Sequence, residues 1–300
     1  MCIVFYTQVQ PGYKLVLAAN RDEYLDRPAS AAHWHRFEQP EQPRDDDYVL
    51  CGRDLGSPDQ GTWLGITRDL RIGILTNIRY PVTPTTTITP SRGLLLKAFL
   101  APPPAQAPPI DDFLNSISSE TYAGFNLLLF HLHKRQNGWG EDEIGYLCNQ
   151  PQHTLLSLSN DNVPSRGISN SPLDAPFPKV VEGEARMTQL LADCHAQGGS
   201  EDDLVENLMS LLSPSRPIKT YTDMTHSTRI DPFLLGPNPN ASPTPEVAGG
   251  RWYATRVSTV ILVKDDGQVL FVERDIATLE DGVVIQGSGE RKERFAAEFS

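Results

Sequence analysis

The sequence predicts a layered α+β fold with mostly antiparallel sheets. Short segments rich in apolar or β-branched residues lie between turn residues, which is the pattern of strands joined by hairpins. Segments 15–19, 127–130 and 260–263 are apolar at every position, so their sheets should be covered on both faces. Amphipathic helical segments are available as covers, and this favours outer helix layers over inner sheets.

Seven segments are predicted strands because they are short, apolar and bounded by turn residues. Turns at 10–12, 68–69 and 265–267 would join three pairs of them into hairpins. Strands that are neighbours in the sequence should therefore be mostly antiparallel. We expect strands at 2–6, 14–20, 63–67, 71–76, 125–131, 258–264 and 269–273.

Four segments are predicted helices because their apolar residues recur on one helical face. Ser200 is well placed to cap the last of them. In the third, Met187, Leu191 and Cys194 share a face. We expect helices at 92–100, 111–118, 181–195 and 201–212.

Proline-rich stretches interrupt the pattern. Proline removes a backbone donor and restricts the residue before it, so these stretches are interpreted as surface loops. None has the character of a linker between domains, and we predict a single domain over residues 1–300. The proline-rich stretches are 81–90, 102–109, 214–217 and 232–245.

The length of the chain allows a large core, and its net charge argues against nucleic-acid binding and binding to anionic membrane surfaces. A chain of 300 residues with 39% hydrophobic content is long enough to bury a large core. The formal net charge is −12 and the isoelectric point is near 5.0. Nucleic acid and anionic membrane surfaces would be repelled by most of such an exterior. We therefore expect no nucleic-acid partner, and an anionic ligand would need a local basic pocket.

The four cysteines are scattered at positions 2, 51, 148 and 194. They form neither the close pairs of a structural zinc site nor a dense disulfide framework, which favours a reducing compartment. No stretch reaches the 18 consecutive apolar residues expected of a membrane span. The apolar run at 15–19 is too short for a signal peptide, so the mature chain is expected to begin at residue 1 or 2.

Cys2 is the first candidate for chemistry. Removal of Met1 would place a thiol and a free α-amine on one residue, and both groups titrate near neutral pH. An N-terminal nucleophile that carries its own base is a known way of activating a thiol. The alternative is that Cys2 is a small buried residue at the start of an apolar strand.

A reaction at an N-terminal thiol needs polar groups that hold the ammonium and orient the substrate, and polar residues at strand ends could supply them. The run 19–23, Ala-Asn-Arg-Asp-Glu, ends the strand that is expected to pair with the first one, which would place its polar side chains near Cys2. Asn77 and Asn170 could each donate to an oxyanion, and Arg256 could hold an anionic substrate group. Each group also has a structural alternative. The run 19–23 could be a charged strand end that leads into solvent, Asn77 and Asn170 could be local turn formers, and Arg256 could form a surface ion pair.

Two histidine pairs, His33-x-His35 and His131-x-His133, would each share a strand face if the backbone is extended. Such a pair could bind a metal or haem. No carboxylate or thiolate lies at a useful short spacing from either pair, so we expect no metal.

Seven short motifs, in this order along nearly the whole chain, resemble the NRDE family, which is the family of transport and Golgi organisation protein 2. The proline-rich stretches look like additions of this chain. The motifs are Met-Cys-Ile at the start, Ala-Asn-Arg-Asp-Glu at 19–23, Gly-Thr-Trp-Leu-Gly-Ile at 61–66, Leu-Thr-Asn at 75–77, Gly-Phe-Asn-Leu-Leu at 124–128, Gly-Ile-Ser-Asn at 167–170 and Thr-Val-Ile-Leu-Val at 259–263.

That family is in turn similar to the N-terminal nucleophile hydrolases of the choloylglycine hydrolase and penicillin acylase group. The resemblance implies a four-layer αββα sandwich in which an N-terminal cysteine attacks an amide. Cys2 matches that cysteine. Asn77 looks like the oxyanion-hole asparagine, and Asn170 like the asparagine of a Thr-Asn-x-Pro motif.

The resemblance is weaker at the second strand, where the hydrolases have Arg-x-x-Asp. Aligning the acidic residues places Asn20 at the arginine and Glu23 at the aspartate, whereas aligning the arginines selects Arg21. A one-residue slip turns a strand side chain to the opposite face, so the two alignments exclude each other. We prefer Glu23 beside the ammonium and Asn20 near the thiol, with Arg21 and Asp22 structural. Arg256 is the match for the hydrolases' distal arginine.

The resemblance implies a cytoplasmic protein, associated with the Golgi or with mitochondria, that acts in Golgi organisation, protein secretion and lipid homeostasis. One hypothesis is hydrolysis of an amide or thioester by Cys2, with an acylated, amphiphilic ligand. The alternative is a non-catalytic protein that binds or traffics lipid, acyl-CoA or haem. The substrate and the oligomeric state are outside what the sequence predicts.

Overall fold

The computed structural model describes residues 2–37, 44, 46–78, 89–158, 163–236 and 250–299. The chain divides into two compact units whose segments alternate along the sequence. The single domain expected over residues 1–300 stays a prediction. The first unit comprises Met1–Arg27, Asn162–Ser169 and Leu173–Arg294, and the second Pro28–Asp161, Asn170–Pro172 and Phe295–Ser300.

The first unit is built on a seven-stranded sheet with the order β12-β1-β2-β14-β15-β18, in which β13 also pairs with β14. The pairs of β2 with β1 and with β14 are antiparallel, and a two-stranded ribbon of β16 and β17 accompanies the sheet. The strands are β1 (Ile3–Thr7), β2 (Tyr13–Tyr24), β12 (Arg166–Ile168), β13 (Phe233–Leu235), β14 (Arg251–Lys264), β15 (Gln268–Asp275), β16 (Ala277–Glu280), β17 (Val283–Gln286) and β18 (Glu290–Ala296).

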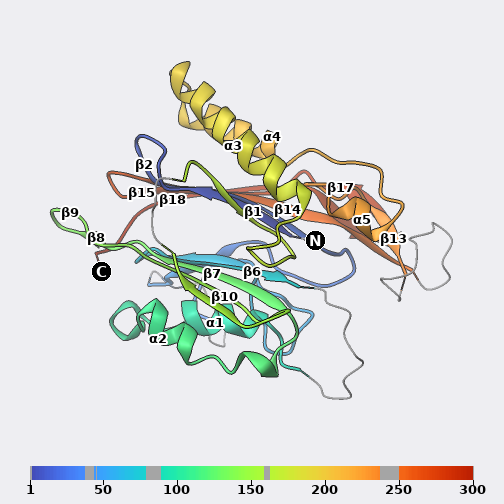
Figure 1. Ribbon diagram of the computed structural model, residues 1–300, viewed down its shortest axis with the longest axis horizontal. Coiled ribbons are helices and arrows are strands. Elements are labelled where there is room, and N and C mark those ends of the chain that lie inside the picture. The colour runs from blue at the N-terminus through green and yellow to red at the C-terminus, as the bar shows by residue number, and fades with distance from the viewer. Residues whose placement is uncertain are drawn as a thin grey trace. The chain divides into compact units, whose positions relative to one another are not determined.

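Two helices, α3 (Pro178–Ala196) and α4 (Glu201–Leu211), cover one face of this sheet (Figure 1). Their apolar faces form a core with alternate residues of β1, β2, β14 and β15. Helix α3 approaches β1 closely because Gly183 lies over Phe5, where a Cβ atom would be 2.0 Å from the ring. Ser200 caps α4 in a reciprocal capping box with Asp203, as predicted. A short helix, α5 (Tyr221–Met224), follows α4.

The second unit is built on another seven-stranded sheet, with the order β11-β10-β7-β6-β5-β4-β3. Its strand pairs are antiparallel, and a small hairpin of β8 and β9 extends from the end of β7. The strands are β3 (His33–His35), β4 (Val49–Cys51), β5 (Leu64–Thr67), β6 (Arg71–Asn77), β7 (Phe125–His131), β8 (Lys134–Arg135), β9 (Gly138–Trp139), β10 (Glu143–Cys148) and β11 (Thr154–Ser157).

Helices α1 (Gly93–Leu100) and α2 (Ile110–Asn115) cover one face of the second sheet (Figure 1). Both pack over glycines. A Cβ at Gly73 would be 2.0 Å from Leu96 of α1, and a Cβ at Gly145 would be 2.4 Å from Ile110 of α2. These glycines let each helix lie closer to the sheet than other residues would allow.

The fold is α+β with antiparallel sheets, as predicted. Side chains on both faces of the central strands are buried, as the apolar runs at 15–19, 127–130 and 260–263 indicated. The two units together contain two sheet layers and two helix layers, which is the set of layers in the predicted αββα sandwich.

Several predicted boundaries were wrong because strand pairing, and not local composition, sets the strand ends. Strand β2 continues to Tyr24 and β14 begins at Arg251, since these two strands pair along almost their whole length. The segment 102–109 holds a single 3₁₀ turn, η1 (Pro104–Gln106). Most of segments 81–90 and 232–245 lies outside the described residues.

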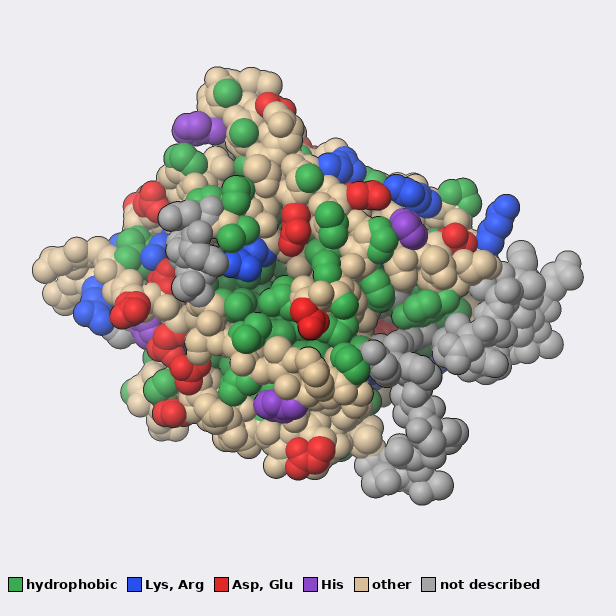
Figure 2. All heavy atoms as spheres, viewed as in Figure 1, with side chains coloured by type: hydrophobic (Ala, Val, Ile, Leu, Met, Phe, Trp, Pro, Cys, Tyr) green, Lys and Arg blue, Asp and Glu red, His purple; other side chains and the backbone are tan. Residues whose placement is uncertain are grey.

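Among the helices of the described residues, none combines the length and the apolar character needed to cross a membrane. Figure 2 shows acidic and basic side chains interspersed on one face of the molecule.

Candidate active site around Cys2

Cys2 lies directly before β1 and is partly buried. Its Sγ donates a weak hydrogen bond to the Asp22 carbonyl oxygen of β2, at 3.8 Å. Its own carbonyl oxygen accepts a hydrogen bond of 2.7 Å from the Ser169 hydroxyl, beside the end of β12. The first residue of the candidate site is therefore held between two neighbouring strands of one sheet.

A buried polar cluster surrounds this position. The Asp22 carboxylate accepts a hydrogen bond of 2.5 Å from the Thr255 hydroxyl, and the Tyr253 hydroxyl donates to the Asp22 carbonyl oxygen at 3.3 Å. Lys179, in the first turn of α3, is only 1% exposed. Burial lowers the pKa of Lys179, and the negative charges of Asp22 and Cys2 oppose that change.

The surroundings keep the Cys2 thiol protonated. Burial raises the pKa of Cys2, and the negative charge of Asp22 adds to the rise. The charges of the chain's amino terminus and of Arg21 act in the opposite direction. The thiol in this environment would need a base to become a nucleophile.

The structure corrects the expected place of Asn20. In the β1–β2 pair Asn20 is opposite Ile3, so its side chain points to the helix-covered face. The Asn20 amide donates to the carbonyl oxygens of Leu212 and Thr228, at 2.9 and 3.0 Å, and accepts from the Ser258 hydroxyl at 2.6 Å. Its hydrogen-bonding groups tie β2 to the chain after α4, and none of these bonds goes to the thiol.

Asp22 and Glu23 are the two acidic residues at the end of β2, and the expected place of Glu23 beside the ammonium stays a prediction. The Glu23 carboxylate accepts a hydrogen bond of 2.8 Å from the Tyr24 backbone. Asp22 is 5% exposed and its charge acts directly on the thiol. Arg21 and Asp22 both act on the thiol through their charges, and their expected structural role stays a prediction. Asp22 lies on the same face of β2 as Asn20, because strand side chains alternate.

Arg256 holds the end of β2. It lies at the irregularity where the β14–β2 register shifts. Its guanidinium donates to the Tyr24 carbonyl oxygen at 3.3 Å and to the Arg27 carbonyl oxygen. These bonds fix the backbone beyond Glu23, and the role of Arg256 toward a substrate stays a prediction.

The structure brings Asn77 and Asn170 together in the second unit. The Asn170 amide donates to the backbone carbonyl of Asn77 at the end of β6. The Asn170 side-chain oxygen is buried and has no hydrogen-bond partner among the described residues. Nearby, Asn126 donates to the Thr76 hydroxyl and to the Ser171 carbonyl oxygen, at 3.0 and 2.9 Å. This is a polar cluster in an otherwise apolar strand region.

The first histidine pair is engaged within its own hairpin. His35 Nδ1 accepts the Phe37 backbone N–H at 3.0 Å, and His35 Nε2 lies 3.2 Å from Cys51 Sγ. Burial lowers the pKa of His35 to about 3, with the neighbouring positive charges acting in the same direction. Both ring nitrogens of His35 are therefore occupied.

Sequence reasoning missed Lys179 because the helix was expected to begin at 181. The buried face of α3 contains Met187 and Leu191, and its four-residue spacing runs back through Gly183 to Lys179. The four-residue spacing was therefore the signal in the sequence that could have placed Lys179 on the buried face of this helix. The Asn126 cluster had no such signal, because its partners come from β6, β10 and the turn after β12.

Two helix-covered antiparallel sheets and a polar cluster around a cysteine at position 2 define an α+β protein with a candidate nucleophile site at its second residue. The profile of the family described as Transport and Golgi organisation 2 matches residues 1–278. The chain belongs to this family.

The relatives are similar over nearly their whole length. The Transport and Golgi organization protein 2 homolog of Bos taurus is 30% identical over 288 residues, covering 92% of this chain and 93% of the relative. The homolog of Homo sapiens is 28% identical over 289 residues, with the same coverage. Transport and Golgi organization protein 2 of Drosophila melanogaster is 26% identical over 290 residues, covering 93% and 94%.

Two mutant forms of the conjugated bile acid hydrolase from Clostridium perfringens resemble the structure at 10% sequence identity. The TM-scores are 0.41 and 0.44, and each comparison covers 100% of this chain and 98% of the other. At these TM-scores the likeness carries no assignment of site residues.

Proposed function

We propose that this protein is an N-terminal nucleophile hydrolase, an amidohydrolase or thioesterase, whose nucleophile is Cys2. The observation that supports this function best is the partly buried thiol in a cluster with Asp22 and Lys179. A buried carboxylate and a buried ammonium beside a cysteine are typical of sites that stabilise the charges formed in a reaction.

The reaction starts after removal of Met1, which frees the α-amine of Cys2. The amine takes the thiol proton, and Sγ attacks the carbonyl carbon of an amide or thioester. The C–N or C–S bond breaks, the leaving group receives the proton, and water then hydrolyses the S-acyl group. Because burial raises the thiol pKa, this adjacent base is what makes the attack feasible near neutral pH.

Asn77 and Asn170 are the proposed oxyanion donors. The hydrogen bond from Asn170 goes to the backbone carbonyl of Asn77 and does not involve the Asn77 side chain. Asn77→Ala keeps that carbonyl. We expect this variant to lower kcat by roughly 10²–10³ with little change in KM.

The proposed substrate is an acylated lipid or a similar amphiphile. The proposed setting is the cytosol with Golgi or mitochondrial association, where the protein would serve Golgi organisation, secretion and lipid homeostasis. The family membership supports this setting through the names of the relatives.

Intact-mass measurement of the protein from its own cells tests the first requirement, which is a free Cys2 amine. Turnover of a panel of amides and thioesters then tests the mechanism. We expect Cys2→Ala to abolish turnover and to leave the melting temperature nearly unchanged, because Cys2 lies outside β1. Cys194→Ala, a thiol in the core of α3, is the matched control. Retained Met1, or turnover without the Cys2 thiol, contradicts the proposal.

The alternative function is non-catalytic binding and traffic of lipid, acyl-CoA or haem. Asn20 favours it, because the position aligned with a hydrolase arginine is committed to structural hydrogen bonds. Haem titration distinguishes the two functions. A Soret band that is lost on changing the histidines or Cys2 supports binding, and an unaltered spectrum removes haem from the candidate ligands.

A further inference from the structure

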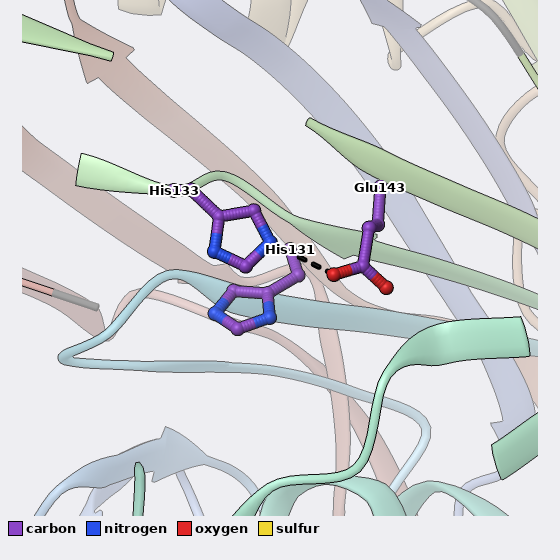
Figure 3. A group of neighbouring side chains, drawn as sticks. All are labelled: His131, His133 and Glu143. Carbon is purple, nitrogen blue, oxygen red and sulfur yellow. Dashed lines mark hydrogen bonds and ion pairs between the residues drawn. The ribbon is translucent and has the colours of Figure 1, made fainter. Parts of the chain in front are cut away.

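The end of β7 carries a second cluster of polar side chains, which shares no residue with the cluster around Cys2. His131 is the last residue of β7 and His133 follows it. Glu143 begins β10 and lies opposite His131 in the antiparallel register. One ligand atom from each of these residues lies within 4.8 Å of the other two (Figure 3).

We propose that His131, His133 and Glu143 form a binding site for a divalent first-row metal ion, with Zn²⁺ as the best match. Two imidazoles and a carboxylate are a ligand set that zinc uses in proteins, with one position left for water or substrate. The sequence predicted no metal here, because no carboxylate lies at a useful short spacing from the histidine pair. The pairing of β7 with β10 supplies one from twelve residues away.

The three side chains already converge. His133 Nε2 is 2.8 Å from Glu143 Oε1, and the rings of His131 and His133 are 3.9 Å apart between centroids. Zinc holds its nitrogen and oxygen ligands at about 2.0–2.2 Å in a tetrahedron, so its ligand atoms are roughly 3.3–3.6 Å apart. Ligand atoms that lie up to 4.8 Å apart must therefore come closer on binding. His133 is the residue placed to adjust, because it is partly exposed and lies between β7 and β8.

Two buried polar atoms next to the cluster independently indicate a missing ligand. His131 Nε2 and Asp69 Oδ1 are buried and have no hydrogen-bond partner among the described residues. His131 is 8% exposed and Asp69 is 2% exposed. A buried polar atom without a partner is costly, and a ring nitrogen bound to a metal no longer carries that cost.

The groups around the cluster suit a metal site. The second carboxylate oxygen of Glu143 accepts the Ile110 backbone N–H at 2.8 Å, which fixes its orientation. Asp69 Oδ2 lies 4.0 Å from His131 Nε2 and accepts from Arg71 Nε at 3.0 Å. Carboxylates and backbone groups of this kind orient metal ligands in known sites.

The experiment measures Zn²⁺ binding to the full chain after treatment with a chelator, by competition with a chromophoric chelator. We expect one zinc ion per chain. His133→Asn and Glu143→Gln should each weaken binding at least tenfold. His133→Asn is the decisive variant, because His133 is partly exposed and lies outside β7 and β8. The melting temperature without zinc verifies that both variants are folded.

Two controls separate this site from others. His153→Asn removes an exposed histidine of the same unit and should leave binding unchanged. Cys2→Ala removes the thiol of the proposed active site and should also leave binding unchanged, so failure of the proposed hydrolase does not affect this result. Equal affinity in His133→Asn and the unaltered chain, or an equal loss in His153→Asn, overturns the proposal.

Discussion

At the scale of single residues, buried polar groups in this protein are satisfied by neighbours that are distant in sequence. Asn20 shows this most clearly, because its partners Leu212 and Thr228 lie about two hundred residues further along the chain. Asn20, which the resemblance aligns with a catalytic position, therefore has a structural role in holding β2 to the segments after α4. Asp22, two residues further along β2, raises the pKa of the Cys2 thiol through its negative charge.

His35 carries a prediction about acid sensitivity. Its pKa in the folded protein is about 3 because the ring is buried near positive charges, whereas an unfolded histidine has a pKa near 6.5. Between these pH values the unfolded chain binds a proton that the folded chain does not. The free energy of unfolding should therefore fall as the pH drops through this window, by up to about 1.4 kcal/mol per pH unit.

Urea unfolding between pH 7 and pH 4 measures this slope. The slope reports how many more protons the unfolded chain binds than the folded chain. His35→Gln should lower this number by up to one, even if the variant is less stable at every pH. The control His153→Gln changes an exposed histidine and should leave the slope as it is. An unchanged slope in His35→Gln would show that His35 is not the group responsible.

At the scale of elements, glycines lie at the closest contacts between each sheet and the helices that cover it. Gly183 of α3 lies against the ring of Phe5, and Gly73 of β6 lies against Leu96 of α1. A side chain at either position would meet fully buried neighbours. The helix-to-sheet distance is thus set by residues that contribute no side chain.

Gly183→Ala tests this close approach. A Cβ atom would lie 2.0 Å from Phe5 Cζ, so the helix or the ring must shift, at a typical cost of about 1–3 kcal/mol. The gain in helix propensity, roughly 1 kcal/mol, should not offset this cost fully. We expect a lower free energy of unfolding in urea. Val181→Ala, an exposed position on the same helix, should change it little, and equal stability of the glycine variant would refute the packing argument.

At the scale of the whole molecule, the two compact units alternate along the chain, and the second unit includes a three-residue segment and the last residues. Neither unit can be cut out as one continuous piece. The prediction of a single domain over 1–300 implies that the units unfold together.

Scanning calorimetry tests this prediction. A single domain gives one transition whose calorimetric and van't Hoff enthalpies agree. Gly183→Ala in the first unit and Gly73→Ala in the second should then both shift this one transition. Two transitions, each moved by only one of the variants, would show that the units unfold separately.

The sequence by itself determined the fold class, the strands β1, β2, β5, β6, β7, β14 and β15, the four main helices and the family. These follow from local patterns: apolar runs such as 125–131 became β7 without change of boundary, and Ser200 caps α4 through neighbours three residues away.

Only the tertiary structure decided which polar side chains meet. Strand pairing brings Cys2 Sγ to the Asp22 carbonyl oxygen and places Glu143 opposite His131. The extra turn of α3 buries Lys179 near Asp22. Strand side chains alternate between faces, so a shift of one residue exchanges one neighbour for another. Local composition does not fix that shift, because register depends on pairing between segments far apart in the sequence.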